Sequence, residues 1–400
     1  MADETIGERL RVCRRYRGMS LQVLADRTGL SKSFLSMAEN GKRQLERRSD
    51  IAVIADVLEL SPSELTGQPY ALPRSRRSSG HAVVPGVRQA LLASSIDAPL
   101  DIPSRGLTEL TRATARVERL CEESDYPAFG GLLPDLLSEL HVAAVSKEER
   151  ARREALRLLV RACHAAFYLV KDLGYLDLAN IAAWQASDAA NRLGDPALSG
   201  LAAFLRAHAL MPAGYRCQAP ALATARDAVG RVQSVPDVAT RDVCGMLHLT
   251  AALISVNMRR VDEAREHLAE AVSLATSAGE SNAFGLRFGS TNVGFWRVNL
   301  TVEMGDGGRA VEIARRLSPG RLESKGRQAA FHADVGRGLA RMSGHDREAI
   351  EEFRRAESLA GEQVRNNPFV RDTVAHLLHC ARREAGGRDL RGLAYRMGLG

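Results

Sequence analysis

Four polar side chains and one aromatic ring stand close together in the first tenth of the chain. They are Ser31, Lys32, Ser33, Phe34 and Ser36. A lysine ammonium can donate hydrogen bonds to O6 and N7 of guanine, and serine is a permissive partner for base edges. The phenylalanine ring has two open interpretations, contact with a thymine methyl group or packing in a core. Side chains at the start of a helix reach base edges when that helix enters the major groove of DNA.

A second group, Asn40, Gly41, Lys42 and Arg43, has residue types that suit contacts with phosphate. Loop amides and basic side chains bind phosphate oxygens whatever the base sequence. The charge distribution agrees, because residues 1–48 hold 11 Lys and Arg against 6 Asp and Glu, whereas the whole chain has a net charge of only +7. A basic segment on a nearly neutral remainder indicates a region that binds a polyanion.

Five short helices are predicted over residues 1–66, and they would position both groups. Ser20 and Ser31 are the predicted N-caps of the second and third helices, since a serine hydroxyl accepts a hydrogen bond from the first helical turn. Gly29 lies between them and can adopt the left-handed conformation that a tight turn requires. Ser-Pro-Ser-Glu at 61–64 predicts the start of the fifth helix, with proline at the first helical position.

The segment from Gln22 to Lys42, QVLADRTGLSKSFLSMAENGK, resembles the helix-turn-helix of Xre/Cro-type bacterial and phage repressors, and the match covers about residues 5–66. The resemblance implies a five-helix, lambda-repressor-like domain that binds double-stranded DNA. One departure concerns the residue after the second-helix cap. The family often has glutamine there, whereas this chain has Leu21 followed by Gln22.

The resemblance also assigns roles to single residues. Lys32, Ser33 and Ser36 match the family's base-reading positions. Arg14 and Glu39 match a pair that bridges the first and third helices, so we expect a structural ion pair that sets the tilt of the third helix. The residues expected to contact DNA are Gln22, Ser31, Lys32, Ser33, Phe34, Ser36, Asn40, Lys42 and Arg43.

The rest of the chain divides into a linker and a helical body. Residues 67–104 are rich in Pro, Ser and Arg and lack clear periodicity, which predicts a flexible linker with a short helix at Val87–Leu92. Its basic run Arg74–Arg77 is expected to be solvated, with nucleic-acid contact as the alternative. From 105 to 400, helical segments alternate with short Gly, Asp or Pro breaks.

A small-x3-apolar-x2-small pattern recurs five times in this body, at intervals of 42, 43, 46 and 39 residues. Such spacing predicts a solenoid of roughly seven helix pairs. The occurrences are Ala179/Ala183/Ala186, Ala221/Ala225/Ala228, Ala264/Leu268/Ala271, Ala310/Ala314/Leu317 and Ala349/Phe353/Ala356.

The body resembles the tetratricopeptide (TPR)-like regions of actinobacterial Xre-type regulators, and Phe288–Asn292 resembles a short element of that group. The layout is similar to that of peptide-sensing regulators with a helix-turn-helix head. In tetratricopeptide arrays the first helix of each pair lines the concave face. We therefore expect an effector site there, with a buried core tryptophan and surface asparagines as the alternative. The candidate residues are His248, Asn257, Asn292, Trp296 and Asn299.

Several other classes of protein are disfavoured. No apolar run approaches about 18 residues, so no membrane span is expected, and the acidic start lacks a secretory signal core. No Walker loop, GxGxxG, HExxH or GxSxG motif is present, so we expect neither an enzyme nor a cofactor. His376, His379 and Cys380 share one helical face, but nothing nearby completes a metal site, so an interface cluster is favoured.

These observations together predict an all-α cytoplasmic transcription regulator. The head at 1–66 is expected to bind operator DNA, and the body at 105–400 to form a homodimer and to bind a small-molecule or peptide effector. Two alternatives remain open. The body could serve only as a protein-interaction scaffold without a small ligand, and an unrecognised enzyme is the weakest of the three.

Overall fold

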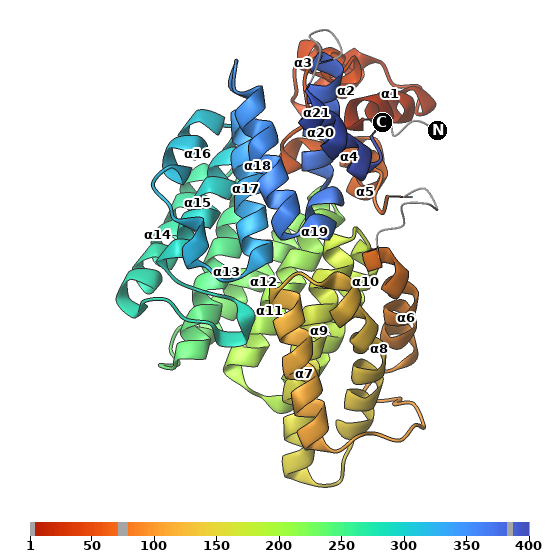
Figure 1. The fold of residues 1–400 in the computed structure, drawn as a ribbon, viewed down its shortest axis with the longest axis vertical. Helices are drawn as coiled ribbons and strands as arrows, with labels where there is room; N and C mark the ends of the chain where they lie inside the picture. The colour runs from red at the N-terminus through yellow and green to blue at the C-terminus, as the bar shows by residue number, and fades with distance from the viewer. Residues whose placement is uncertain (1–4, 71–78, 382–386, 400) are drawn as a thin grey trace.

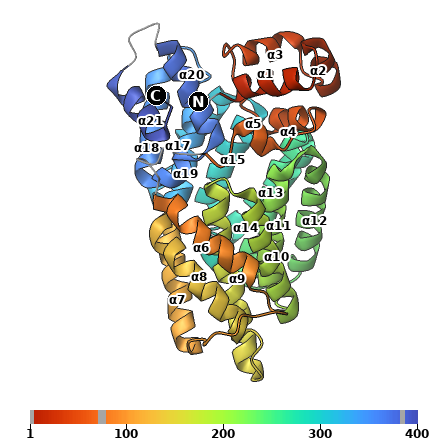
Figure 2. The same cartoon turned by 90° about the vertical axis from the view of Figure 1, so that its right-hand side faces the viewer.

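The computed structural model describes residues 5–70, 79–381 and 387–399, and throughout these residues every regular element is a helix (Figures 1 and 2). None of the described helices is long and apolar enough to cross a membrane. Five helices form the head, in red and orange in Figure 1: α1 Ile6–Tyr16, α2 Leu21–Thr28, α3 Lys32–Glu39, α4 Arg48–Val57 and α5 Pro62–Thr66.

Local capping explains where the head helices begin and end, and it confirms the expected boundaries. Ser20 Oγ accepts from the backbone N–H of Val23 at the start of α2. Gly29 ends α2 with φ of 69°, a conformation that costs glycine little. At the start of α5, Ser61 and Glu64 form a reciprocal capping box, with Pro62 as the first helical residue.

Helix α6, Ser79–Ala93, corrects the flexible linker predicted over 67–104. It is longer than the expected helix at Val87–Leu92 and packs against α8 of the body, with Val87 and Leu91 in the core. Pro85 lies inside it, and the burial of this apolar face outweighs the hydrogen bond that a proline cannot donate. The basic run at 74–77 lies outside the described residues.

The body is an α-solenoid of tetratricopeptide-like helix pairs, stacked one after another along the chain (Figure 1). Six consecutive pairs run from α7 to α18. Their members are α7 Leu107–Glu122, α8 Tyr126–Ala143, α9 Glu149–Asp172, α10 Leu176–Leu193, α11 Pro196–Leu210, α12 Gln218–Val232, α13 Val238–Asn257, α14 Val261–Ala278, α15 Ser290–Met304, α16 Gly307–Ala314, α17 Lys325–Leu339 and α18 Asp346–Leu359. The chain then continues through α19 Gly361–Arg365, α20 Pro368–Ala381 and α21 Arg388–Met397.

The recurring small residues lie on the second helix of each pair, from α10 to α18. The alanines of all five occurrences are buried, and Ala183, Ala225 and Ala349 are fully so. Because an alanine side chain ends at Cβ, it lets the second helix approach its neighbours closely. The spacing pattern therefore identified the packing face of the solenoid.

The head is joined to the body by a buried ionic cluster around Glu303 of α15. The side chains of Glu303 and Arg337 are only 1% and 3% exposed. Arg48, the first residue of α4, donates its backbone N–H to Glu303 (3.2 Å) and its guanidinium forms an ion pair with the same carboxylate. Arg337 of α17 donates from Nη2 to Glu303 (3.0 Å). Burial would raise the pKa of Glu303, but the two arginines and the hydrogen bonds hold that pKa below its ordinary value.

Helix α20 provides a second contact between head and body (Figure 2). Asp372 accepts from the backbone N–H of Ile6 (3.1 Å), and His376 Nδ1 lies 3.2 Å from the carbonyl oxygen of Gly41. The ring of Phe369 belongs to the head's apolar core. The head is thus held by residues more than 250 positions away in the sequence.

We predict that Glu303→Ala lowers the free energy of unfolding by about 3–5 kcal/mol, because it leaves buried Arg337 with Asp334 as its remaining carboxylate partner. Glu312→Ala is the matched control. Its exposed pair with Arg309 should contribute about 1 kcal/mol or less. Urea unfolding followed by circular dichroism measures both variants. Equal losses in the two would contradict a structural role for the Glu303 cluster.

Candidate nucleic-acid interface and central cavity

The first turn of α3 presents the expected base-reading residues at the outer end of the head, away from the body (Figure 2). Ser31 caps the helix by accepting from the backbone N–H of Phe34 (3.1 Å), so its hydroxyl also has a structural role. Lys32 and Ser33 are exposed. Ser36 is half-buried one turn later.

Phe34 takes part in the packing of the head, and its contact with a thymine methyl group stays a prediction. It is partly buried and packs against the apolar core of the head. The guanidinium carbon of Arg43 lies 5.1 Å from its ring centroid. The ring therefore joins the start of α3 to the loop that follows the helix.

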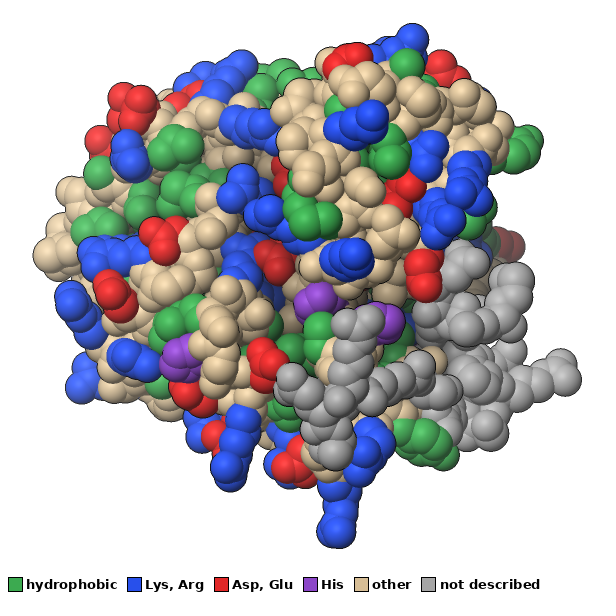
Figure 3. All heavy atoms as spheres, turned by 90° about the horizontal axis from the view of Figure 1, so that it is seen from above, with side chains coloured by type: hydrophobic (Ala, Val, Ile, Leu, Met, Phe, Trp, Pro, Cys, Tyr) green, Lys and Arg blue, Asp and Glu red, His purple; other side chains and the backbone are tan. Residues whose placement is uncertain are grey.

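The expected phosphate-contacting residues surround the end of α3. Asn40 donates its side-chain amide to the carbonyl oxygen of Ser36 (2.7 Å), while Lys42 and Arg43 are exposed. Gln22 is exposed on α2 and donates to Asp26 (2.8 Å). Figure 3, which views the end of the molecule that carries the head, shows Lys and Arg side chains spread over this face with fewer acidic ones among them.

The bridge expected between the first and third helices is confirmed. Arg14 donates from Nε and Nη2 to the two carboxylate oxygens of Glu39, at 2.5 and 2.7 Å, and both residues are buried. Arg14 also donates to the carbonyl oxygen of Met19. The bidentate geometry fixes the orientation of α3 relative to α1.

Close packing of α1 against α3 reinforces this bridge. A Cβ atom on Gly7 would lie 2.0 Å from the carbonyl oxygen of Ala38, a distance that no real contact adopts. Only glycine lets the two helices approach so closely. The position of α3 therefore depends on a backbone contact as well as on an ion pair.

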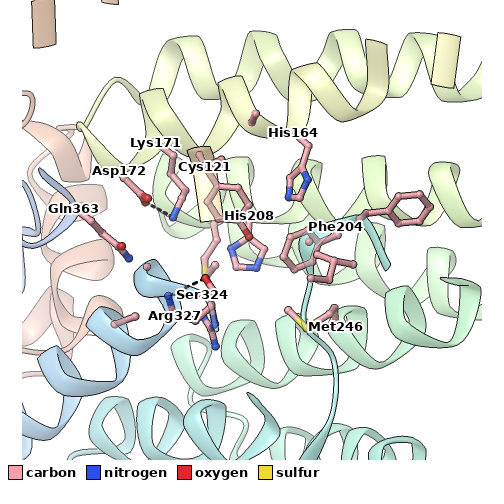
Figure 4. A pocket seen from close by; sticks show the side chains of 18 of the residues that line it. Cys121, His164, Lys171, Asp172, Phe204, His208, Met246, Ser324, Arg327 and Gln363 are labelled. Carbon is pink, nitrogen blue, oxygen red and sulfur yellow. Dashed lines mark hydrogen bonds and ion pairs between the residues drawn. The ribbon is translucent and has the colours of Figure 1, made fainter. Parts of the chain in front are cut away.

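A cavity of about 1000 Å³ occupies the centre of the body, as Figure 4 shows from close by. The first helices of the pairs line it, from α7 to α17, while the second helices contribute little beyond their first residues. Helices α4 and α5 of the head line one end of it, through residues that include Arg48, Ile51 and Pro62. The cavity is large enough for a ligand of ordinary metabolite size.

Two of the five expected effector residues line this cavity. Trp296 is 5% exposed, and its indole N–H has no hydrogen-bond partner in the part of the chain that the structure describes. Asn299 donates to Asp334 (2.8 Å). The tryptophan is thus part of the core and of the cavity wall at once.

The other three expected effector residues do not line the cavity, and their placement is corrected. His248 lies toward the second helix of its pair, where its Nδ1 is 3.0 Å from that of His267. Asn257 is buried at the end of α13, outside the cavity lining. Asn292 is fully buried and acts indirectly, since its side-chain oxygen accepts from Arg327, which does line the cavity. A position on a first helix is not sufficient to place a residue in the cavity lining, because only one face of each first helix points toward the concave side of the solenoid.

The cavity also contains groups that sequence reasoning missed, notably Arg327, His208 and His164 (Figure 4). Burial, and then the charges of Lys171 and two arginines, lower the pKa of His208 to about 3. Burial lowers the pKa of His164 to about 4. Both imidazoles are therefore neutral at physiological pH. Their position on first helices was the only sequence signal.

A continuous polar path links the cavity wall to the head. Asn299 donates to Asp334, and Arg337 donates to the same carboxylate from Nη1 (3.0 Å). Arg337 also binds Glu303, which holds Arg48 of the head. Side chains in direct contact therefore connect the cavity wall with the head.

No group of three or more potential ligands capable of holding a metal ion occurs in the described residues. His376 contacts the head instead, through Gly41, and its Nε2 lies 3.7 Å from the thiol of Cys380.

Comparison with known proteins identifies the head. Residues 5–66 match the family model described as a helix-turn-helix domain. No curated protein matches the chain. Among solved structures, the chain is similar to the crystal structure of Bacillus thuringiensis PlcR in complex with the peptide PapR7 and DNA. The TM-score is 0.37 at 10% identity, over 89% of this chain and 94% of that chain.

We predict that Gly7→Ala lowers the thermal stability of the head, because α1 and α3 must separate to admit the methyl group. The expected cost is about 1–3 kcal/mol, typical of overpacking. Gly131→Ala in α8 is the control, because its Cβ would meet nothing within 4 Å and alanine favours a helix. Hydrogen exchange of the amides of α1 and α3 measures the effect. Unchanged protection in Gly7→Ala would refute the proposed close contact.

Proposed function

We propose that the chain is a sequence-specific, DNA-binding transcription regulator of the Xre type, which acts by binding and not by catalysis. The observation that carries this proposal is the exposed first turn of α3 on a helix-turn-helix domain. Lys32 and Ser33 are exposed there, and Lys42 and Arg43 are exposed in the loop that follows α3, where they suit contacts with phosphate. The arrangement suits base contacts from α3 and backbone contacts from the loop after it.

We further propose that the regulator is a homodimer, since one such head makes few base contacts and repressors with this domain pair on two-fold operators. The effector part of the proposal has the central cavity as its site. The scaffold alternative, a body without a small ligand, is less favoured because the cavity has buried polar groups without partners. The head forms part of the cavity wall, so a ligand there would contact or displace it.

Lys32→Ala should lose discrimination at one base position of each half-site, by about 1–3 kcal/mol. Lys42→Ala is the matched comparison, because it removes the same side chain from the loop after α3. It should weaken binding to all sequences alike and reduce the salt slope by about one unit. Genome-wide mapping of bound DNA supplies the operator, and titration against a base-substituted series gives the profiles. An unchanged base profile in Lys32→Ala would show that α3 does not read bases.

The assembly prediction concerns the full chain, since α6 packs into the body and a fragment starting at residue 105 would lack it. Sedimentation velocity is expected to give twice the monomer mass of 43.4 kDa. Titration of operator DNA should then give two chains per site. A chain that stays monomeric both free and on DNA would remove the dimer from the proposal.

A further inference from the structure

Among the described residues, Arg327 differs from most other basic residues that line the central cavity in its lack of an ion-pair partner. The other basic residues that line it either pair with carboxylates or, in the case of Arg119, lie exposed at its edge. The pairs are Arg48 with Glu303, Arg157 with Glu154, Arg161 with Glu118 and Lys171 with Asp172. No carboxylate among the described residues forms an ion pair with Arg327.

Neutral groups hold Arg327 in place. Its Nε and Nη2 donate to the side-chain oxygen of Asn292, at 3.1 and 2.7 Å. Its guanidinium carbon lies 5.3 Å from the ring centroid of Trp296. An amide oxygen and an aromatic face orient a guanidinium but do not neutralise it. Arg327 is half-buried, and the charge of Asp334 acts on it without forming an ion pair. A guanidinium that lacks an ion-pair partner in a cavity wall can pair with an anionic ligand that is not part of the chain.

The surroundings of Arg327 are rich in donors. Figure 4 shows Arg327 from α17, His208 from α11 and Lys171 from α9 around the same space. The buried indole N–H of Trp296 lacks an acceptor. The positive charges of Lys171 and Arg327 help burial to keep His208 neutral. This part of the cavity lining therefore suits a ligand group that carries one negative charge and accepts hydrogen bonds.

The wall beyond these donors is apolar and aromatic. Phe204, Met246 and Leu253 line it, and the ring of Phe204 lies 4.5 Å from that of His208. The indole face of Trp296 continues this surface. A ligand with a charged end at Arg327 would thus place an apolar portion against these side chains.

We propose that the central cavity binds a monocarboxylate with an apolar or aromatic body, whose carboxylate pairs with Arg327. One guanidinium without an ion-pair partner balances one charge. Asn292 accepts from its Nε–Nη2 edge, and the N–H groups of the Nη1–Nη2 edge match the two oxygens of a carboxylate. A phosphate dianion would retain an uncompensated charge, because Lys171 is already paired with Asp172. This inference deepens the effector part of the proposed function and rests on it.

Trp296 provides a direct readout, because the chain has only two tryptophans. Trp184 is 61% exposed and lies outside the cavity lining, so Trp184→Phe leaves Trp296 as the single emitter. The probes are two matched pairs that differ in one charge. They are 4-phenylbutyrate with 4-phenylbutan-1-ol, and N-acetyl-Leu-Phe with its C-terminal amide. The first pair represents a free acid and the second the C-terminus of a short peptide.

In the Trp184→Phe protein, at least one acid should bind about ten-fold or more tighter than its neutral partner, as a charge-assisted bidentate contact requires. Arg327→Gln in this background should reduce that preference to within about two-fold. Arg327→Lys should restore part of it. Arg119→Gln, the matched control at the edge of the cavity, removes an equal charge and should leave the preference unchanged.

The possible results distinguish a failure of the carboxylate site from a failure of the proposed regulator. Equal binding of acids and neutral partners overturns the carboxylate site even if Arg327→Gln fails to fold, because the wild-type residue is present in that comparison. A preference that survives in Arg327→Gln, or falls equally in Arg119→Gln, also overturns it. The binding assay contains no DNA, so failure to bind DNA would reject the proposed regulator and leave the carboxylate result standing. Which acid binds decides between a free acid and a peptide terminus.

Discussion

The carboxylate of Glu303 holds the two parts of the molecule together. It lies at the N-terminus of α4, where the backbone N–H of Arg48 would otherwise lack an acceptor, and it is also bound by Arg337 from the body. A negative charge at this end of a helix is favoured by the helix dipole. Because the group is almost completely buried, its charge must be compensated, and Arg48 and Arg337 both contribute to that. The placement of the head against the body therefore depends on this cluster together with the contacts of α20.

The same cluster connects the central cavity with the helix-turn-helix head. On one side it reaches the cavity through Arg337, Asp334 and Asn299, and on the other it holds the first turn of α4. Helix α4 in turn packs with α2 of the head. A flexible linker alone would transmit a signal poorly, since it leaves the head free to sample many positions. The direct contact provides a route that does not depend on the segment between head and body.

The cavity is a consequence of the way in which the helix pairs of the solenoid pack. Small residues on the second helices draw the pairs together on the outside, and the first helices then curve around an interior space. Stability alone would favour filling that space or lining it with apolar groups. Instead, in the part of the chain that the structure describes, it contains neutral imidazoles, an indole N–H without a hydrogen-bond partner and Arg327 without an ion-pair partner. Such departures from an optimal core are typical of binding sites.

The sequence by itself determined the features that local rules govern. Serine caps, Gly29 and the ion pair of Arg14 with Glu39 identified the head, and the alanine spacing identified the solenoid, since both depend on contacts within one motif or between neighbouring helices. It did not reveal the full length of α6 or its packing against the body, since Pro85 resembles a linker residue, nor did it reveal the orientation of His248. The Glu303 cluster and the surroundings of Arg327 were decided only by the tertiary structure, because they unite residues up to hundreds of positions apart, and the curvature of the whole stack determines which of them meet.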